Sequence, residues 1–252
     1  THIYTKALIS SRPSLDVRLK RLPTIQDFLT EKVPSEIVTS AERAAFHDKI
    51  YAKKPLLEII NVEKEYLSRT GILGKTSSFK AVNDVSFKLY EGETLGLVGE
   101  SGCGKSTLGN TILQLDKATA GTILYRGQDI TKLQGSELRK LRREIQIIFQ
   151  DPYSSLNPRI PVGKAIMEPM QVHKLYKSDK ECKAKTIEIL ERVGLGAEHF
   201  NRYPHEFSGG QRQRDAVARA LVNKPSIILA DEPTGNLDSK TSEEIMKLFG
   251  DI

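Results

Sequence analysis

The string Gly99-Glu-Ser-Gly-Cys-Gly-Lys-Ser-Thr107 constrains the fold of this chain more than any other segment. It fits the pattern Gly, four residues, Gly, Lys, Ser or Thr, and it follows an apolar run at 94–98. This order predicts a buried strand, a tight turn and a helix over 105–115. Because glycines lack Cβ atoms, successive N–H groups of the turn can face one anion, which the helix N-terminus also attracts. The segment therefore predicts a triphosphate-binding loop, with a chance glycine-rich turn as the alternative.

Every residue of this loop is an expected nucleotide contact. Lys105 supplies a cation for the phosphates, and the Ser106 hydroxyl can ligate Mg²⁺, which prefers oxygen ligands. The expected contacts are Gly99, Glu100, Ser101, Gly102, Cys103, Gly104, Lys105, Ser106 and Thr107. A loop of this kind alone fits kinases, small GTPases, helicases and motors equally well.

A second string narrows the family. Phe207-Ser-Gly-Gly-Gln211 lies 20 positions before an Asp-Glu pair that ends an apolar run at 227–230. With the phosphate loop before it and Asp231-Glu-Pro-Thr-Gly-Asn-Leu-Asp238 after it, this string resembles the signature of ATP-binding cassette (ABC) proteins. The resemblance implies ATP and Mg²⁺ as ligands. It also implies an α/β P-loop NTPase cassette with a mixed core sheet, an antiparallel flap and a helical subdomain.

Two carboxylates follow the run at 227–230, which is typical of a central strand of a parallel sheet, buried on both faces. Asp231 and Glu232 would emerge at the C-terminal end of that strand, where open α/β sheets place their ligands. We expect Asp231 to hold Mg²⁺ opposite Ser106, and Glu232 to orient and polarise the attacking water. The alternative is two exposed carboxylates that begin a loop.

The same resemblance implies two further contacts. Gln150 ends the apolar run Ile145-Gln-Ile-Ile-Phe149 and resembles the glutamine whose amide reaches Mg²⁺ and the attacking water in this family. It completes an expected catalytic set of Glu232, Lys105 and Gln150. Tyr66, after a strand-like segment at 56–62, is the candidate for stacking on adenine. Taken alone, the glutamine fits a polar strand end before a turn, and the tyrosine fits amphipathic packing.

The segment between the glutamine and the signature has a helical pattern. Residues 178–193 keep charges on one side and apolar residues on another, which fits a helical subdomain over about 151–222. The signature residues Ser208, Gly209, Gly210 and Gln211 would begin its last helix and face phosphate. If the geometry of the family holds, that phosphate belongs to ATP on a second, facing cassette, in cis or in trans. Asp238 would then lie in the loop that links the two sites.

Composition excludes several classes of protein. No stretch approaches the roughly 18 consecutive apolar residues of a membrane-spanning helix, and nothing resembles a secretory signal. The two cysteines, Cys103 and Cys182, imply no disulfide framework, and no His/Cys cluster suggests zinc or an iron–sulfur centre. Any membrane role must come through docking, which we expect at the cytoplasmic face of a bacterial inner membrane.

The first 55 residues do not look like the opening of a cassette. They carry ten Lys and Arg against six Asp and Glu, and four prolines punctuate them. A short helix is expected at 41–50. The opening His2-Ile-Tyr-Thr resembles the stretch beyond the cassette core in peptide-importer ATPases. We therefore expect 1–55 to be the tail of one cassette plus a solvated linker, and 56–252 to be a second cassette.

Two features depart from the family. The switch histidine that the family carries beyond the catalytic Glu has no counterpart, since His205 is the last histidine and the sequence stops at 252. We expect slow or undetectable hydrolysis from this C-terminally truncated piece. Asp215 stands where the family has Ile or Val. It would either set a charge against apolar packing or be a first-turn acid stabilised by the helix dipole and Arg219, and we favour the second.

The main hypothesis is an ATPase that powers import of di- or oligopeptides through integral membrane permease subunits. It rests on the segments at 151–158 and 203–211, which resemble the peptide and nickel importer group. The alternative is a soluble ABC-type ATPase acting on nucleic acid or the ribosome, consistent with a pI of about 9.1. Such proteins carry inserted coiled coils or zinc modules, which are not visible between Gly99 and Asp238, so no nucleic acid is expected. A nucleotide-binding module without turnover is the third hypothesis.

Overall fold

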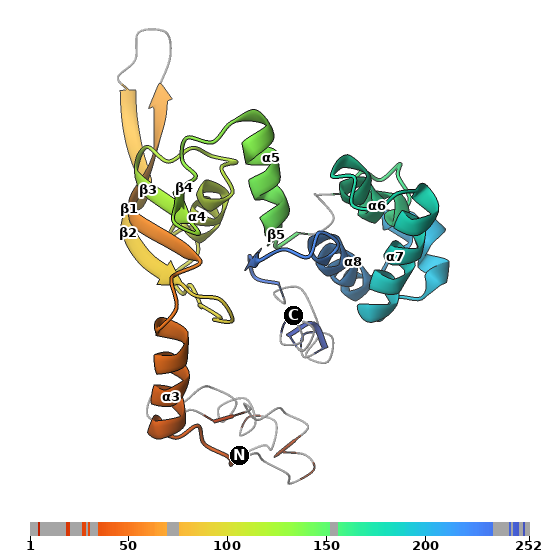
Figure 1. Cartoon of the computed structure of the whole chain (residues 1–252), viewed down its shortest axis with the longest axis horizontal. Helices are drawn as coiled ribbons and strands as arrows, with labels where there is room; N and C mark the ends of the chain where they lie inside the picture. The colour runs from red at the N-terminus through yellow and green to blue at the C-terminus, as the bar shows by residue number, and fades with distance from the viewer. Residues whose placement is uncertain are drawn as a thin grey trace. The chain divides into compact units, whose positions relative to one another are not determined.

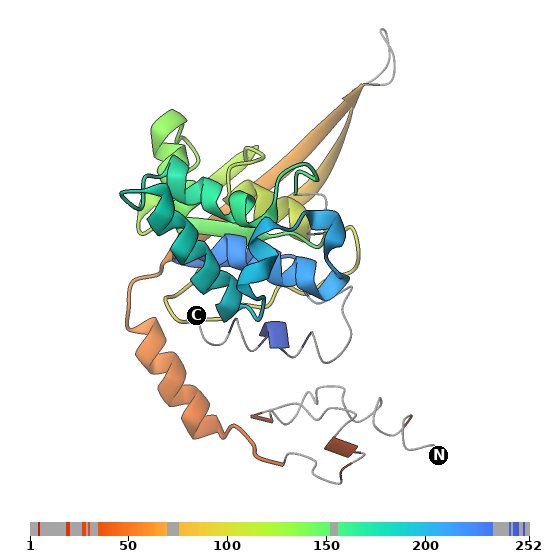
Figure 2. The same ribbon diagram turned by 90° about the vertical axis from the view of Figure 1, so that its right-hand side faces the viewer.

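The structure, a computed structural model, describes residues 35–69, 76–151 and 156–233, together with 5, 19–20, 27–28, 30, 242, 244–246 and 249. The chain divides into two compact units, residues 1–56 with 89–94 and residues 57–88 with 95–252. Figures 1 and 2 show the helices and strands in two views.

The first unit contains helix α3 (Ser40–Tyr51), which confirms the helix predicted at 41–50. Its start is fixed by a capping box: the Thr39 hydroxyl accepts from the Glu42 N–H at 3.1 Å, and the Glu42 carboxylate accepts from the Thr39 N–H at 2.8 Å. At its other end the Tyr51 hydroxyl donates to Glu93 at 3.2 Å. The Tyr51 ring also packs at 4.8 Å from that of Tyr90, so the end of α3 is tied to the turn at 89–94.

The second unit begins with a four-stranded sheet in the order β2-β1-β3-β4. Its strands are β1 (Leu57–Arg69), β2 (Thr76–Leu89), β3 (Ala120–Tyr125) and β4 (Gln128–Asp129). Strands β1 and β3 pair antiparallel, with Leu57 opposite Tyr125 and Ile59 opposite Ile123. Leu57, Ile59 and Ile123 are almost fully buried. Alternate residues therefore face one core, and the predicted antiparallel flap is confirmed.

A second sheet has two parallel strands, β5 (Ile145–Ile148) and β6 (Ile227–Ala230), with Ile145 opposite Ile227 and Ile148 opposite Ala230. Helix α5 (Gly135–Glu144) leads directly into β5. The strand predicted at 227–230 is confirmed, but its burial on both faces is not: Ile227 is buried and Ala230 is exposed. The physical reason is the small sheet, since in the described part of the chain only one strand pairs with β6.

The strand predicted at 94–98 is wrong. This segment has no regular structure, Leu95 and Leu97 are more than 40% exposed, and Val98 is 98% exposed. A strand exists only where a neighbour accepts and donates its backbone hydrogen bonds. No described strand pairs with this segment. The apolar run therefore precedes the glycine-rich loop without regular structure.

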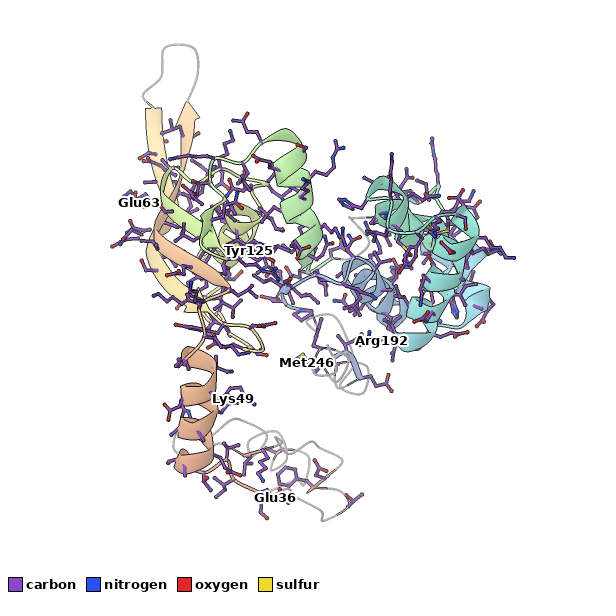
Figure 3. The ribbon with its side chains drawn as sticks, in the orientation of Figure 1. Glu36, Lys49, Glu63, Tyr125, Arg192 and Met246 are labelled. Atoms are coloured by element: carbon purple, nitrogen blue, oxygen red, sulfur yellow. The ribbon has the colours of Figure 1, made fainter. Side chains whose placement is uncertain are left out.

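The helices of the second unit form two groups. Helix α4 (Lys105–Ile112) follows the glycine-rich loop and packs on β1, and it ends three residues before the predicted end. Three helices, α6 (Val162–Val172), α7 (Asp179–Arg192) and α8 (Gly209–Leu221), gather with the short turns η1 (Ala197–Asn201) and η2 (Pro204–Glu206). Their side chains fill the space between them (Figure 3). Ile166, Leu190 and Val217 are fully buried there, and α7 confirms the helix predicted at 178–193.

Asp215 does not lie in the first turn of its helix, so the interpretation that we favoured is wrong. Helix α8 begins at Gly209, which places Asp215 in the second turn, with no solvent exposure. Neither oxygen of its carboxylate has a hydrogen-bond partner among the residues that the structure describes. Burial raises the pKa of Asp215 to about 7, and the opposing effect of the Arg219 charge is smaller. The acid therefore stands in the apolar packing where the family has Ile or Val.

Candidate nucleotide-binding site

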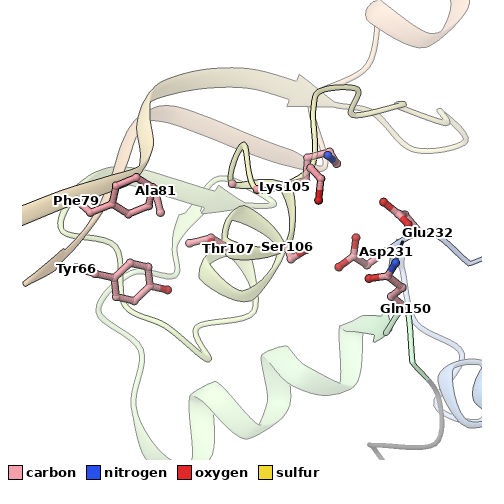
Figure 4. Close-up of a pocket in the computed structure, with 12 residues that line it drawn as sticks. Tyr66, Phe79, Ala81, Lys105, Ser106, Thr107, Gln150, Asp231 and Glu232 are labelled. Atoms are coloured by element: carbon pink, nitrogen blue, oxygen red, sulfur yellow. Dashed lines mark hydrogen bonds between the residues drawn. The ribbon is translucent and has the colours of Figure 1, made fainter. Parts of the chain in front are cut away.

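A cavity of about 470 Å³ brings the glycine-rich loop together with distant parts of the chain (Figure 4). Ten of its lining residues were predicted from the sequence, and two were not. It is lined by Tyr66, Phe79, Ala81, Ser101, Gly102, Gly104, Lys105, Ser106, Thr107, Gln150, Asp231 and Glu232.

The loop reaches the cavity because its glycines adopt conformations that other residues resist. Gly104 caps α4 with a φ of 99°, and a Cβ atom there would lie 2.0 Å from the carbonyl oxygen of Ala81. Strand β2 therefore lies directly against the loop, and only glycine fits. The N-terminus of α4, with its unpaired N–H groups, opens at the same place. This arrangement suits an anion.

Lys105 is held inside the loop. Its Nζ donates to the carbonyl oxygens of Gly99 at 2.8 Å and Glu100 at 2.9 Å, and it lies 3.7 Å from Cys103 Sγ. Gly99, Glu100 and Cys103 were predicted as nucleotide contacts, but they do not line the cavity. In this structure they contact the lysine instead.

Gln150, Asp231 and Glu232 form a polar group at one end of the cavity (Figure 4). The parallel ladder positions them, since the Asp231 N–H continues it by donating to the Ile148 carbonyl oxygen at 2.9 Å. The Gln150 amide then donates to the Glu232 carboxylate at 2.7 Å. Glu232 has a φ of 44°, in the left-handed region, which directs the chain away from the strand at this point.

Tyr66 lies at the other end of the cavity (Figure 4). Its hydroxyl donates to Asp116 Oδ2 at 3.0 Å, and Lys64 Nζ stands 4.9 Å from its ring centroid. Loss of hydration raises the pKa of the Tyr66 phenol, and the bond to Asp116 raises it further. The phenol therefore stays a neutral donor, and the ring is held in one orientation.

Phe79 and Ala81 were missed from the sequence. Ala81 meets the loop through its backbone oxygen, which no side-chain pattern could show. Phe79 carried one usable signal, because it is a large aromatic residue flanked by Ser78 and Lys80. Asp116, which fixes Tyr66, gave no sequence signal.

The signature residues begin α8 and do not line the cavity. Ser208 Oγ accepts from the Gln211 N–H at 3.4 Å, and Gln211 Oε1 accepts from the Ser208 N–H at 3.0 Å, which is a capping box. The Gln211 amide nitrogen also contacts His199 Nε2 at 3.2 Å. A Cβ on Gly209 would meet nothing within 4 Å, so this helix start is open. Asp238 lies outside the described residues.

The donors in the cavity fit a magnesium ion. Hydroxyl, carboxylate and amide oxygens come from Ser106, Asp231 and Gln150, and all three residues line the same cavity. Within the described residues no group of three or more His, Cys, Asp and Glu side chains could hold a metal by itself. Mg²⁺ is commonly held by one or two carboxylates together with substrate phosphates, which matches this sparse set.

Known proteins resemble this chain along most of its length. It is 44% identical over 251 residues to the glutathione import ATP-binding protein GsiA of Pectobacterium atrosepticum, covering 98% of this chain and 39% of GsiA. It is 48% identical over 198 residues to the oligopeptide transport ATP-binding protein OppF of Bacillus subtilis, covering 78% of this chain and 63% of OppF. The chain thus spans about two fifths of GsiA.

A solved structure shares the fold. The ATP-binding cassette MJ0796, solved as a dimer in a post-hydrolysis state bound to ADP and Pi, matches with a TM-score of 0.68 and 37% identity. The match covers 77% of this chain and 81% of that one. In the described part of the chain, no helix is both long and apolar enough to cross a membrane. The ABC transporter model matches residues 82–235, more than half of the sequence, and the chain therefore belongs to the ABC transporter family.

Proposed function

We propose that this chain belongs to a cassette that binds and hydrolyses ATP. One observation carries the proposal: a single cavity brings the Lys105 and Ser106 loop together with Gln150, Asp231 and Glu232, although these segments lie far apart in the sequence. A bound ATP would have its phosphates at the loop, its reacting end at the carboxylates and its base at Tyr66. This order follows the cavity as Figure 4 draws it.

The loop would bind the triphosphate by exchange of hydrogen bonds. The Lys105 ammonium, which now donates to two loop carbonyl oxygens, would donate to phosphate oxygens instead. The N–H groups at the start of α4 add donors and partial positive charge. Mg²⁺, when held by Ser106, Asp231 and Gln150, would supply positive charge against the phosphate oxygens.

Glu232 would orient and polarise the water that attacks the γ-phosphate. Its carboxylate is already held by the Gln150 amide at 2.7 Å, so the glutamine is its positioning residue. Phosphoryl transfer depends mostly on positioning and on electrostatic stabilisation, and both side chains would provide these. We propose Lys105, Gln150 and Glu232 as the catalytic set.

A second cassette would complete the site. Ser208, Gly209, Gly210 and Gln211 do not line the cavity of their own chain, yet they present an open helix start. We propose that they bind the phosphates of ATP on a facing cassette, and that Asp238 belongs to the same contact. The dimeric form of the structural relative supports this pairing. We also propose that residues 1–55 are the tail of a preceding cassette together with a linker.

Peptide import is the proposed biological role, through permease subunits at the cytoplasmic face of a bacterial inner membrane. It is supported by the likeness to proteins named for glutathione import and oligopeptide transport. Uptake of labelled glutathione and of a labelled oligopeptide would test it, in cells whose complete protein carries Lys105→Ala. We expect loss of uptake for one of these cargoes. Unchanged uptake of both would contradict the role in import of these peptides.

ATP binding itself is tested by calorimetric titration of this chain with ATP and Mg²⁺. Lys105→Ala should weaken binding at least about tenfold, because it removes a charge-assisted phosphate contact. Lys140→Ala is the matched control, an exposed lysine on α5 that does not line the cavity. Equal affinities of the parent chain and Lys105→Ala would refute the proposed site.

A further inference from the structure

Two aromatic side chains share one end of the cavity. Tyr66 comes from β1 and Phe79 from β2, which are hydrogen-bonded neighbours in the sheet. Their exposed fractions are 41% and 63%, which is high for rings that line a pocket. Figure 4 shows both at the end away from Gln150, Asp231 and Glu232. The cavity therefore has an aromatic end and a charged end.

Tyr66 is prepared to stack on one side only. Its hydroxyl is bonded to Asp116, and Lys64 Nζ lies over its ring. Lys64 is itself held, because its Nζ donates to the Lys117 carbonyl oxygen at 2.9 Å. The Lys64 ammonium thus covers one face of the Tyr66 ring. The ring lines the cavity, so its other face is the one left for stacking.

Phe79 has no role in the packing of the core. It makes no ring contact among the described residues, and its neighbours Ser78 and Lys80 are polar and exposed. Phe79 and Ala81 are two residues apart on β2 and so share a face of the strand, and both line the cavity. The Ala81 carbonyl oxygen lies against the phosphate loop at Gly104, and Phe79 stands about 7 Å farther along β2. A nucleotide whose phosphates lie in the loop would extend its base toward this ring.

We propose that Phe79 and Tyr66 form a two-sided aromatic clamp that receives the nucleobase. The proposal rests on the nucleotide site proposed above and adds a second wall to it. Aromatic rings stack on the faces of bases, and a base offers more stacking surface the larger it is. The clamp therefore favours purine over pyrimidine nucleotides, and it adds nothing to the binding of a triphosphate without a base.

The test compares Phe79→Ala with the parent chain in three titrations, with ATP, CTP and inorganic tripolyphosphate, each with Mg²⁺. We expect the Kd for ATP to rise about tenfold, the Kd for CTP to rise less and that for tripolyphosphate to stay unchanged. Phe79→Tyr should restore ATP affinity, and Phe79→Leu, which keeps apolar bulk without a π face, should not. Leu67→Ala is the matched control, because Leu67 is 72% exposed on β1 and does not line the cavity.

The outcomes distinguish failure of the proposed aromatic clamp from failure of the proposed nucleotide-binding site. Unchanged ATP affinity in Phe79→Ala, while Lys105→Ala still loses binding, would overturn the clamp and leave the site standing. Equal losses for ATP and tripolyphosphate would also overturn it, because the effect would then lie in the phosphate loop. If the parent chain binds neither ATP nor tripolyphosphate, both proposals fail. Circular dichroism of Phe79→Ala and Phe79→Leu checks that the hairpin of β1 and β2 is kept.

Discussion

Two apolar runs in this chain end in a motif that faces the same cavity, yet only one of them is a strand. The run at 227–230 pairs in parallel with β5 and delivers Asp231 and Glu232. The run at 94–98 pairs with no described strand, and its side chains lie in solvent. Both fit the same sequence pattern, so the pattern alone does not make a strand. A run becomes a strand only where another strand pairs with it and other residues bury its side chains.

The motifs behind the two runs are held in different ways. The glycine-rich loop is fixed by contacts close in sequence, such as the Lys105 bonds to Gly99 and Glu100, and by the approach of β2 at Gly104. Asp231, by contrast, depends on a partner far away in the sequence, the carbonyl oxygen of Ile148. We therefore expect that weakening the pairing of β5 with β6 would displace the carboxylates Asp231 and Glu232. The conformation of the glycine-rich loop should change less.

The largest expected effect is on the free energy of unfolding, through the helix that packs against β5, the strand paired with β6. Helix α8 packs against β5 and carries the buried Asp215. The pKa of Asp215 is about 7 in the folded chain and near 3.8 when unfolded, so the unfolded chain loses its proton first. Between these pH values the unfolded chain holds fewer protons, and the free energy of unfolding falls as pH rises from about 4 to about 7. Asp215→Ile should remove this fall and add on the order of 4 kcal/mol at pH 8.

Urea unfolding at pH 5 and pH 8 measures this effect. Asp215→Asn separates charge from polarity, because it keeps the size of the side chain and loses the ionisation. Its free energy of unfolding should show no contribution from Asp215 to the pH dependence, while part of the cost of burying a polar group remains. Equal stability of the parent and Asp215→Ile at pH 8 would show that the acid is solvated in solution.

The next largest effect is the difference in free energy of unfolding between a substitution in the paired strands and one in the unpaired run at 94–98. Ile148 in β5 is 1% exposed, so Ile148→Ala should lower the free energy of unfolding by about 3 kcal/mol through lost packing and a cavity. Leu97→Ala, in the unpaired run, should cost less than about 0.5 kcal/mol, because the side chain is 47% exposed. Chemical denaturation of both variants measures the difference. Similar losses in the two variants would mean that the run at 94–98 is packed in solution.

This contrast also explains how far the sequence could predict the structure. Helices α7 and α8 were both predicted, α7 from the amphipathic pattern of 178–193 and α8 from the resemblance of the signature residues that begin it. The run at 94–98 was not, because its state depends on a partner strand that no local pattern identifies. Asp215 was assigned to the first turn of its helix, but it is the seventh residue of α8, which begins at Gly209. A turn holds about 3.6 residues, so this acid lies in the second turn.

In the candidate site the division is similar. Lys105, Ser106, Asp231 and Glu232 were predicted because their chemistry follows from short motifs. Phe79 and Ala81 were not, because they reach the cavity only through the pairing of β1 with β2 and the approach of β2 to the loop. Gly99, Glu100 and Cys103 belong to the motif but do not line the cavity, and they contact Lys105 instead. A motif therefore predicts which segment lies at the site better than which of its side chains line it.

A smaller effect tests whether the loop is set by β2. Gly104→Ala places a Cβ against the Ala81 carbonyl oxygen, whereas Gly102→Ala meets nothing within 4 Å. Both glycines have positive φ values, so both variants share the backbone cost of about 1 kcal/mol. The additional clash should make Gly104→Ala about 1 to 3 kcal/mol less stable than Gly102→Ala and should weaken ATP binding further. Thermal unfolding and ATP titration of the two variants give the comparison, and equal values would show that β2 can move away.

The smallest expected effect concerns the end of the paired run, where the Gln150 amide donates to Glu232. This bond joins the residues that follow β5 and β6, so it reports whether the ladder stays closed up to the cavity. A double-mutant cycle on the free energy of unfolding, with Gln150→Ala and Glu232→Ala, isolates this bond. We expect a coupling free energy of about 0.5 to 1 kcal/mol, because both side chains are exposed. Raising the salt concentration should change it little, since the amide carries no net charge. A coupling of zero would mean that the two strand ends separate in solution, and the positioning role proposed for Gln150 would then have to arise only when ATP is bound.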